Sequence, residues 1–153
     1  MSDPFAELPD APGDAAPTGG ASIRVLIVDD SAMTRAMVRR SVTLSGVDAE
    51  VEEAADGQFA LDALAAAQRR GRPFDVCFLD LNMPRVNGIE VAMAVHADAA
   101  MPTRVVIVSS EAMASRVRQL QEAGVSGYVR KPFKPEQIRQ VLAGVLAEGR
   151  VAA

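Results

Sequence analysis

The sequence contains one cysteine and one histidine among its 153 residues. Cys77 has no partner for a disulfide and lies in a predicted core strand, so we interpret it as a small buried hydrophobic residue of a protein in a reducing compartment. His96 lies near the end of a predicted helix, where the helix dipole favours a histidine. Because no other metal-ligating residues cluster around His96 in the sequence, we assign it neither a metal-binding nor a phosphodonor role.

Long apolar runs and an excess of positive charge are also missing. No stretch approaches the roughly 18 apolar residues of a membrane span. The N-terminus has no basic region followed by a hydrophobic run, so no secretion signal is predicted and we expect a cytoplasmic protein. Residues 1–22 hold four acidic residues and no Lys or Arg, which leaves 16 acidic and 16 basic residues in 23–153. This neutral balance excludes nucleic acid as an expected partner, and no membrane partner is expected either.

The chain divides into a tail and one ordered domain. Residues 1–21 are rich in Pro, Gly, Ala and Asp and have no hydrophobic period, so they are predicted to form a disordered acidic tail. Phe5 and Leu8 in this tail could instead form a short docking motif. Residues 22–149 are predicted to form a single domain with its own core, and 150–153 a short C-terminal tail.

Within the predicted domain, hydrophobic strands alternate with amphipathic helices. The apolar run Ile23–Val28 is typical of a strand buried on both faces, whereas Ala49–Ala54 is more polar and is expected nearer a sheet edge. The other predicted strands are Val76–Leu79, Arg104–Ser109 and 127–129, and the predicted helices are 31–45, 57–70, Gly88–Ala97, 112–123 and a last one from 135 onward. Five strand–helix units imply an α/β fold with a parallel sheet covered on both faces.

The apolar spacing also predicts which helix faces turn inward. We expect the first helix, capped by Ser31, to turn Met33, Met37 and Val42 toward the core. The arginines of this helix are interpreted as solvated, with contact to a kinase or phosphatase as the alternative: Arg35, Arg39 and Arg40. In the last helix, apolar residues recur at the spacing of one helical face: Ile138, Val141, Leu142, Val145 and Leu146.

Polar groups stand where several of the predicted strands end. Asp29 and Asp30 follow the first strand, Asp80 the third, and Lys131 the fifth, while Ser109 ends the fourth. In an open parallel sheet, ligands bind at the carboxyl ends of the strands. Clustered carboxylates repel one another unless a cation neutralises them, and Mg²⁺ prefers oxygen ligands. Each element alone also fits a helix cap, a turn or a solvated lysine, but the combination predicts a site for Mg²⁺ and a phosphoryl group.

The residues around these strand ends resemble the receiver domain of bacterial two-component response regulators, the CheY-like family. The matching segments are 28–31 (Val-Asp-Asp-Ser), 79–84 (Leu-Asp-Leu-Asn-Met-Pro) with Gly88 after it, 108–112 (Val-Ser-Ser-Glu-Ala) and 124–133 (Gly-Val-Ser-Gly-Tyr-Val-Arg-Lys-Pro-Phe). The resemblance covers about residues 23–147. It implies a flavodoxin-like (βα)5 fold, which is a doubly wound parallel sheet with the strand order 2-1-3-4-5 known for this family.

The resemblance assigns chemical roles to the acidic residues. Asp80 corresponds to the phosphoacceptor of the family. Asp29 and Asp30 correspond to the acidic pair that binds Mg²⁺ together with Asp80, and Asn82 contributes its backbone carbonyl. By the same comparison, Asn82 and Glu111 occupy two positions that tune dephosphorylation in the family, and this pair resembles the chemotaxis regulators.

The resemblance also assigns a set of residues that bind and sense the phosphoryl group. Ser109 takes the place of the switch hydroxyl, which is more often a threonine, and Lys131 that of the phosphoryl-binding lysine. Tyr128 corresponds to the aromatic residue that turns inward when Ser109 moves. Pro132 follows Lys131 in what is, in the family, a cis peptide bond. Ser110 is larger than the usual residue beside the phosphate and is expected to slow the access of water or a phosphatase.

These implications lead to an expected function. The chain resembles a stand-alone receiver that takes a phosphoryl group from a sensor histidine kinase and then binds a downstream protein through its fourth helix, fifth strand and fifth helix. A phosphatase is a further candidate partner, and we expect a monomer or a phosphorylation-dependent dimer. It is expected to be no enzyme beyond its own phosphorylation and dephosphorylation. The alternatives are a phosphorelay intermediate or phosphate sink, a phosphorylation-independent interaction module, and an aspartate-dependent phosphohydrolase; the last is disfavoured because Asn82 stands where such enzymes carry a second aspartate.

Overall fold

The computed structural model describes residues 22–83, 86–110 and 116–152, so the predicted tail 1–21 and Glu111 lie outside the described residues. Five parallel strands form one sheet in the order β2-β1-β3-β4-β5, which confirms the predicted fold and strand order. The strands are β1 (Ile23–Val28), β2 (Ala49–Ala54), β3 (Val76–Leu79), β4 (Arg104–Ser109) and β5 (Gly127–Arg130). As expected from its polar sequence, β2 lies at one edge of this sheet.

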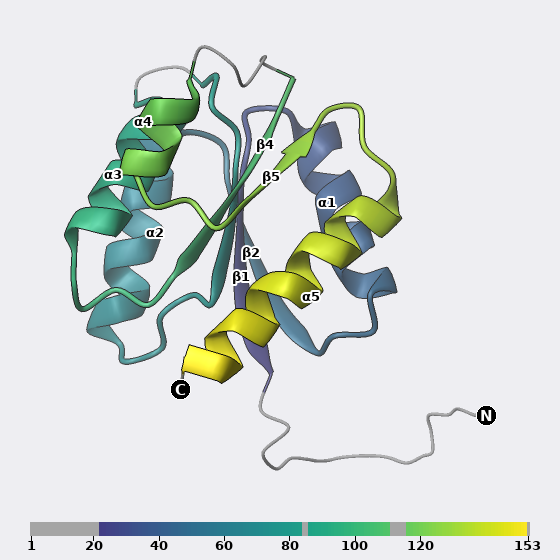
Figure 1. Cartoon of the computed structure of the whole chain (residues 1–153), viewed down its shortest axis with the longest axis horizontal. Coiled ribbons are helices and arrows are strands. Elements are labelled where there is room, and N and C mark those ends of the chain that lie inside the picture. The colour runs from purple at the N-terminus through teal and green to yellow at the C-terminus, as the bar shows by residue number, and fades with distance from the viewer. Residues whose placement is uncertain (1–21, 84–85, 111–115, 153) are drawn as a thin grey trace.

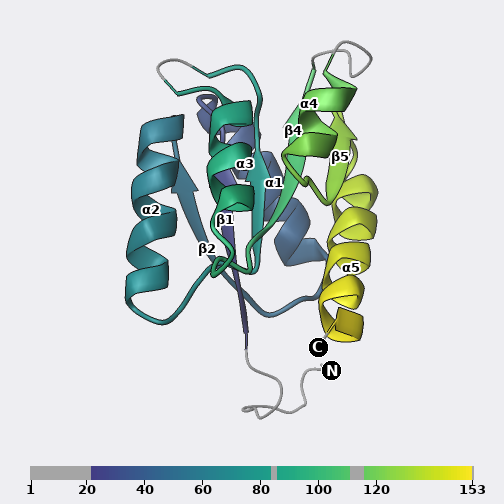
Figure 2. The same cartoon turned by 60° about the vertical axis from the view of Figure 1, so that its left-hand side comes forward.

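Helices cover both faces of the sheet, as Figure 1 shows and as the turned view in Figure 2 confirms. The helices are α1 (Ala32–Leu44), α2 (Gly57–Arg69), α3 (Gly88–Ala97), α4 (Val117–Glu122) and α5 (Pro135–Ala152). Helices α1 and α5 lie side by side on one face, and α2, α3 and α4 cover the other. Side chains therefore alternate along β1: Val25 and Ile27 belong to the core under α1 and α5, and Leu26 and Val28 belong to the core under α2, α3 and α4.

Side-chain caps determine where three of the helices begin. The Ser31 hydroxyl accepts a hydrogen bond from the Thr34 N–H, which confirms Ser31 as the cap of α1. Asp56 caps α2 in the same way, and Asn87 forms a reciprocal capping box with Glu90 at α3. Because these caps directly follow strand-end loops, they also fix the loops that carry the acidic residues.

Two predicted core residues of α1 are in fact exposed. Met33 and Met37 expose 75% and 44% of their surface, whereas Val38 and Val42 are buried against the sheet and α5. The prediction for Val42 is therefore confirmed, and that for the two methionines is wrong. Both stripes have helical spacing, so the apolar pattern alone could not choose between them.

The ends of the later elements differ slightly from the prediction. Helix α4 is described from Val117, and the predicted start at 112 lies outside the described residues. Helix α5 continues to Ala152 and so enters the range 150–153 that was predicted to be a tail. Its buried residues Ile138, Leu142 and Val145 confirm the predicted inward face.

The residues singled out for their rarity have ordinary structural surroundings. Cys77 is buried in β3, as predicted, and burial raises the pKa of its thiol to about 12, so the thiol is unreactive at neutral pH. His96 is exposed near the end of α3. Within the described residues, no helix is both long and apolar enough to cross a membrane.

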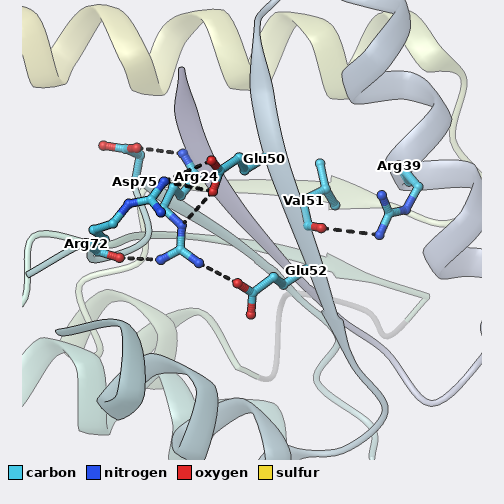
Figure 3. Close-up of polar contacts among 7 residues, drawn as sticks. All are labelled: Arg24, Arg39, Glu50, Val51, Glu52, Arg72 and Asp75. Carbon is cyan, nitrogen blue, oxygen red and sulfur yellow. Dashed lines mark hydrogen bonds and ion pairs between the residues drawn. The ribbon is translucent and has the colours of Figure 1, made fainter. Parts of the chain in front are cut away.

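A buried arginine at the opposite end of the sheet from the strand carboxyl ends holds the edge strand in place. Figure 3 shows Arg24 of β1 between Glu50 and Glu52 of β2. The guanidinium group lies 4.4 Å above the centre of the Phe74 ring and also donates to the carbonyl of Arg72. Only 7% of Arg24 is exposed, so these partners replace its hydration. Through them Arg24 connects β1 to β2 and to the segment that precedes β3.

Replacing Arg24 by methionine is expected to lower the free energy of unfolding by about 1–2 kcal/mol, because the ring contact and the buried hydrogen bond are both lost. The matched control is Arg72→Met, since Arg72 also pairs with Glu50 but its side chain is 59% exposed. That change is expected to cost at most about 0.5 kcal/mol. Urea unfolding of both variants checks the difference, and equal losses would show that burial of Arg24 adds nothing.

Candidate phosphoryl and metal site

Three carboxylates meet at the carboxyl ends of β1 and β3. One oxygen from each of Asp29, Asp30 and Asp80 lies within 4.8 Å of the other two. They come together because β1 and β3 are neighbours in register, with Val28 opposite Leu79, so the residues that follow these two strands lie side by side. Asp29 and Asp80 are only 2% and 5% exposed, whereas Asp30 faces solvent. The sequence prediction that these residues share one place is confirmed.

The surroundings of Asp80 disfavour its charged form. Burial raises the pKa of the Asp80 carboxyl, and the negative charge of Asp29 raises it further, whereas Lys131 lowers it. The backbone N–H of Asn82 donates to Asp80 Oδ1 over 3.4 Å, which is a weak hydrogen bond. The carboxylate of Asp80 is therefore incompletely neutralised by the protein itself.

Asp29 is held more tightly than Asp80. Its Oδ1 accepts a hydrogen bond of 2.8 Å from the Ser31 N–H, and its Oδ2 lies 2.8 Å from Lys131 Nζ. The same ammonium group is 3.7 Å from Asp80 Oδ2. Lys131 thus bridges the two buried carboxylates and lies closer to Asp29 in this structure.

The donor set fits a hard divalent cation. Lys131 supplies one positive charge against three carboxylates, so the site has an excess of negative charge. Two of the three carboxylates, Asp29 and Asp80, are buried. Oxygen atoms are the ligands that Mg²⁺ prefers, and protein sites for Mg²⁺ usually offer only a few of them. The acidic cluster is therefore suited to hold Mg²⁺, and the contribution of the Asn82 carbonyl stays a prediction.

The ends of β4 and β5 bring the other predicted residues to the same edge. Ser109 is fully buried at the end of β4, and the Tyr128 hydroxyl donates to the Ser109 carbonyl over 3.3 Å. The Lys131 N–H donates to the same carbonyl over 3.0 Å, which extends the pairing of β4 and β5 into the loop. The Lys131–Pro132 bond is cis, as the resemblance predicted. Tyr128 is half-buried at this edge, and Ser110 is exposed.

A pocket adjoins the carboxylates and contains residues that the sequence did not identify. Its volume is about 270 Å³, and it is lined by Asp30, Leu81, Asn82, Met83, Asn87 and Arg116. Arg116 places a cationic side chain among these residues, but no local motif marks it, since it only precedes the fourth helix. Glu111, predicted to tune dephosphorylation, lies outside the described residues, so its role stays a prediction.

Gly88 permits a close approach between the start of α3 and the end of β3, where Asp80 lies. The Gly88 N–H donates to the Leu81 carbonyl over 3.1 Å, so the start of α3 folds back onto the end of β3. A Cβ atom at residue 88 would lie 2.1 Å from the Asp80 carbonyl oxygen, closer than any side chain can approach. The glycine is therefore required by the close contact between the two backbone segments.

Comparison with known proteins agrees with this geometry. The family model of the response regulator receiver domain matches residues 25–143, and the chain belongs to this family. The chemotaxis protein CheY homolog of Campylobacter jejuni is 33% identical over 130 residues, which cover 83% of this chain and 95% of that protein. The osmosensing histidine protein kinase SLN1 of Saccharomyces cerevisiae is 26% identical over 121 residues, which are 79% of this chain but only 10% of the kinase.

Solved structures show the same likeness. The chemotaxis protein CheY4 of Vibrio cholerae superposes with a TM-score of 0.70 at 36% identity, over 82% of this chain and 99% of that one. The signal receiver domain of the response regulator NarL from Mycobacterium tuberculosis also gives 0.70, at 33% identity over 80% and 94% of the two chains. The chain is thus a CheY-like receiver of the two-component type.

Proposed function

We propose that Asp80 accepts a phosphoryl group from the phosphohistidine of a sensor histidine kinase. The observation that carries this proposal is the convergence of Asp29, Asp30, Asp80 and Lys131 at one edge of the sheet. In the reaction, an Asp80 carboxylate oxygen bonds to phosphorus while the bond from phosphorus to the histidine nitrogen breaks. The imidazole, which carries a proton on its other nitrogen, leaves with that electron pair as a neutral ring, and the product is an aspartyl phosphate.

The neighbouring residues supply the electrostatics of this transfer. Asp29, Asp30 and Asp80 would hold Mg²⁺ together with the Asn82 carbonyl, and the bound ion would offset charge on the phosphoryl oxygens. Lys131 lies 3.7 Å from Asp80 and can donate to a phosphoryl oxygen there. The Ser31 N–H keeps Asp29 oriented toward the same place.

Phosphorylation would then change the surface formed by α4, β5 and α5. The Ser109 hydroxyl binds the phosphoryl group, and Tyr128, whose hydroxyl contacts the Ser109 carbonyl, changes its rotamer. A groove of about 460 Å³ on this surface supports the proposal, because it is lined by Tyr128 itself with Val129, Arg130, Gln137, Gln140 and Val141. A downstream protein would bind here. The chemotaxis relatives favour a motility target, and a relay or phosphate sink is the alternative.

This chemistry leads to proposals for the partners, the compartment and the oligomeric state of the protein. The kinase supplies phosphate in the cytoplasm, and a phosphatase can remove it, at a rate that Asn82 and Glu111 would tune. The unphosphorylated protein would be a monomer, and the phosphorylated one could pair through the same surface. The chain would catalyse only this transfer and the hydrolysis of the aspartyl phosphate.

Replacing Lys131 by glutamine is expected to change two properties in opposite directions. Phosphoryl transfer should slow by about a hundredfold, because a preorganised donor to the phosphoryl oxygens is lost. Mg²⁺ affinity should rise, because the ammonium 2.8 Å from Asp29 Oδ2 no longer competes with the metal. Single-turnover phosphorylation and calorimetric titration with Mg²⁺ measure the two effects. A parallel fall of both would instead indicate general loss of the fold.

Phosphorylation by acetyl phosphate tests the proposed function without knowledge of the kinase. The protein is incubated with the donor in the presence of Mg²⁺ or of EDTA, and the intact mass is measured. We expect one added phosphoryl group with Mg²⁺ and none with EDTA. A folded protein that gains no phosphoryl group from this donor or from any phosphorylated histidine kinase would refute the proposal and favour an interaction module.

A further inference from the structure

A chain of polar contacts runs from the edge strand to the backbone of the metal site. Arg35 Nη1 donates to the backbone carbonyl oxygen of Asp29 over 2.6 Å. The Nε of the same guanidinium donates to Glu53 Oε1 of β2 over 2.8 Å. The second oxygen of Glu53 accepts from Arg39 Nε, also over 2.8 Å. Two arginines of α1 therefore share one carboxylate, but Arg35 alone of the two also reaches the acidic loop.

The position of Arg35 explains why it reaches this loop. Side chains on a helix point back toward its N-terminus, so Arg35 covers the turn between β1 and α1. Arg39 lies one turn further on and meets the Val51 carbonyl instead, over 3.4 Å (Figure 3). The Arg35 side chain is 18% exposed, against 45% for Arg39. A cation near a helix N-terminus is unfavourable for the helix dipole, so Glu53 and the carbonyl compensate for its placement.

Arg35 completes the set of contacts that fix Asp29. The Asp29 N–H donates to the Ala54 carbonyl over 3.1 Å, and the two side-chain oxygens contact Ser31 and Lys131. The carbonyl that accepts the hydrogen bond from Arg35 belongs to the peptide group that links Asp29 to Asp30. Its orientation therefore affects the directions of both acidic side chains.

Glu53 is well suited to anchor the guanidinium. Burial alone would raise the pKa of Glu53, but the hydrogen bonds from Arg39 and Arg35 lower it, so the carboxylate stays charged at neutral pH. Glu53 lies opposite Ile27 in the β1–β2 register, one position before the pairing of Val28 with Ala54. The anchor thus stands on a fixed strand beside the loop.

We propose that Arg35 is a positioning residue of the divalent-cation site, which it serves by tying the Asp29–Asp30 peptide to Glu53. Arg35 contacts Glu53 and the Asp29 carbonyl and would therefore act on the cation only through the backbone of Asp29. The inference rests on the proposed function, because it assumes that these carboxylates bind Mg²⁺. It replaces the interpretation of Arg35 as a solvated residue, whereas Arg39, which pairs with the same Glu53, is exposed as predicted.

Calorimetric titration of the full chain with Mg²⁺ tests this proposal, with Arg39→Gln as the matched control. Both Arg35→Gln and Arg39→Gln remove one guanidinium from Glu53, but only the first frees the Asp29 carbonyl. We expect Arg35→Gln to weaken Mg²⁺ binding about tenfold, as loss of outer-shell support does at metal sites. Arg39→Gln should stay within about twofold of wild type, as for an exposed ion pair. Arg35→Lys should lie between them, because one ammonium cannot hold both partners as the fork does.

The outcomes separate this proposal from the proposed function. If wild type binds Mg²⁺ and Arg35→Gln binds it as tightly as Arg39→Gln, or more tightly, the positioning role is refuted while the metal site stands. If wild type binds no Mg²⁺, both proposals fail. Urea unfolding in EDTA shows whether Arg35→Gln is folded, and Arg35→Lys provides the comparison if it is not. A loss of Mg²⁺ affinity without a matching loss of stability in EDTA is the result that a purely structural role would not produce.

Discussion

Replacing Asp80 by asparagine is expected to abolish phosphoryl incorporation from acetyl phosphate. An amide offers no carboxylate oxygen to bond to phosphorus, and the two neighbouring carboxylates, Asp29 and Asp30, are assigned to the cation. The matched control is Asp75→Asn at the opposite end of β3. Its carboxylate accepts a hydrogen bond of 2.8 Å from the backbone N–H of Arg24. This control should be labelled like wild type. A full phosphoryl group on Asp80→Asn, measured as intact mass, would contradict the assignment.

The same substitution is expected to stabilise the metal-free protein. Asp80 is a buried carboxylate with Asp29 and Asp30 close by, so its charge opposes folding when no cation is bound. Removing this repulsion should raise the free energy of unfolding in EDTA by at least about 1 kcal/mol, the scale of a charge pair at this distance. Stabilisation by added Mg²⁺ should shrink at the same time. A less stable Asp80→Asn in EDTA would show that the protein already compensates this charge.

Replacing Gly88 by alanine is expected to damage both stability and phosphorylation. The new Cβ would lie 2.1 Å from the Asp80 carbonyl oxygen, so the end of β3 or the start of α3 must move. Overpacking of this kind costs about 1–3 kcal/mol. Phosphoryl transfer should slow as well, because the displaced backbone carries the acceptor itself.

Gly144→Ala is the matched control for this change. Gly144 lies in α5, and a Cβ there meets no atom within 4 Å. An alanine in a helix is favoured over glycine, so this variant should gain about 0.5–1 kcal/mol and keep the wild-type phosphorylation rate. Urea unfolding and initial rates with acetyl phosphate compare the two. Equal stability of Gly88→Ala and wild type would mean that the β3–α3 loop relaxes freely.

The fold and the acidic cluster could be predicted because both follow from the alternation of strands and helices along the chain. Hydrophobic runs mark the strands, and parallel strands place the residues that follow them at one edge. Asp29, Asp80 and Lys131 therefore meet although more than a hundred residues separate the first from the last. The family resemblance supplied the strand order and the cis bond before Pro132.

The orientation of α1 could not be predicted from its apolar spacing. Met33 and Met37 form one apolar stripe and Val38 and Val42 another, and the structure buries the second. In the orientation that buries Val38 and Val42, Arg35 faces Glu53 and the Asp29 carbonyl while the methionines turn outward. A backbone carbonyl partner leaves no mark in a sequence, so this contact required the structure, as did the place of Arg116 in the pocket that Asp30 also lines.

The most direct test of the central claim identifies the phosphorylated residue itself. The protein is labelled with acetyl phosphate and Mg²⁺, reduced with borohydride to convert an aspartyl phosphate to homoserine, and mapped by peptide mass spectrometry. We predict homoserine at residue 80, with Asp29 and Asp30 unchanged. Homoserine at Asp29 or Asp30, or a phosphate that resists reduction because it is carried by another residue type, would contradict the claim that Asp80 is the acceptor.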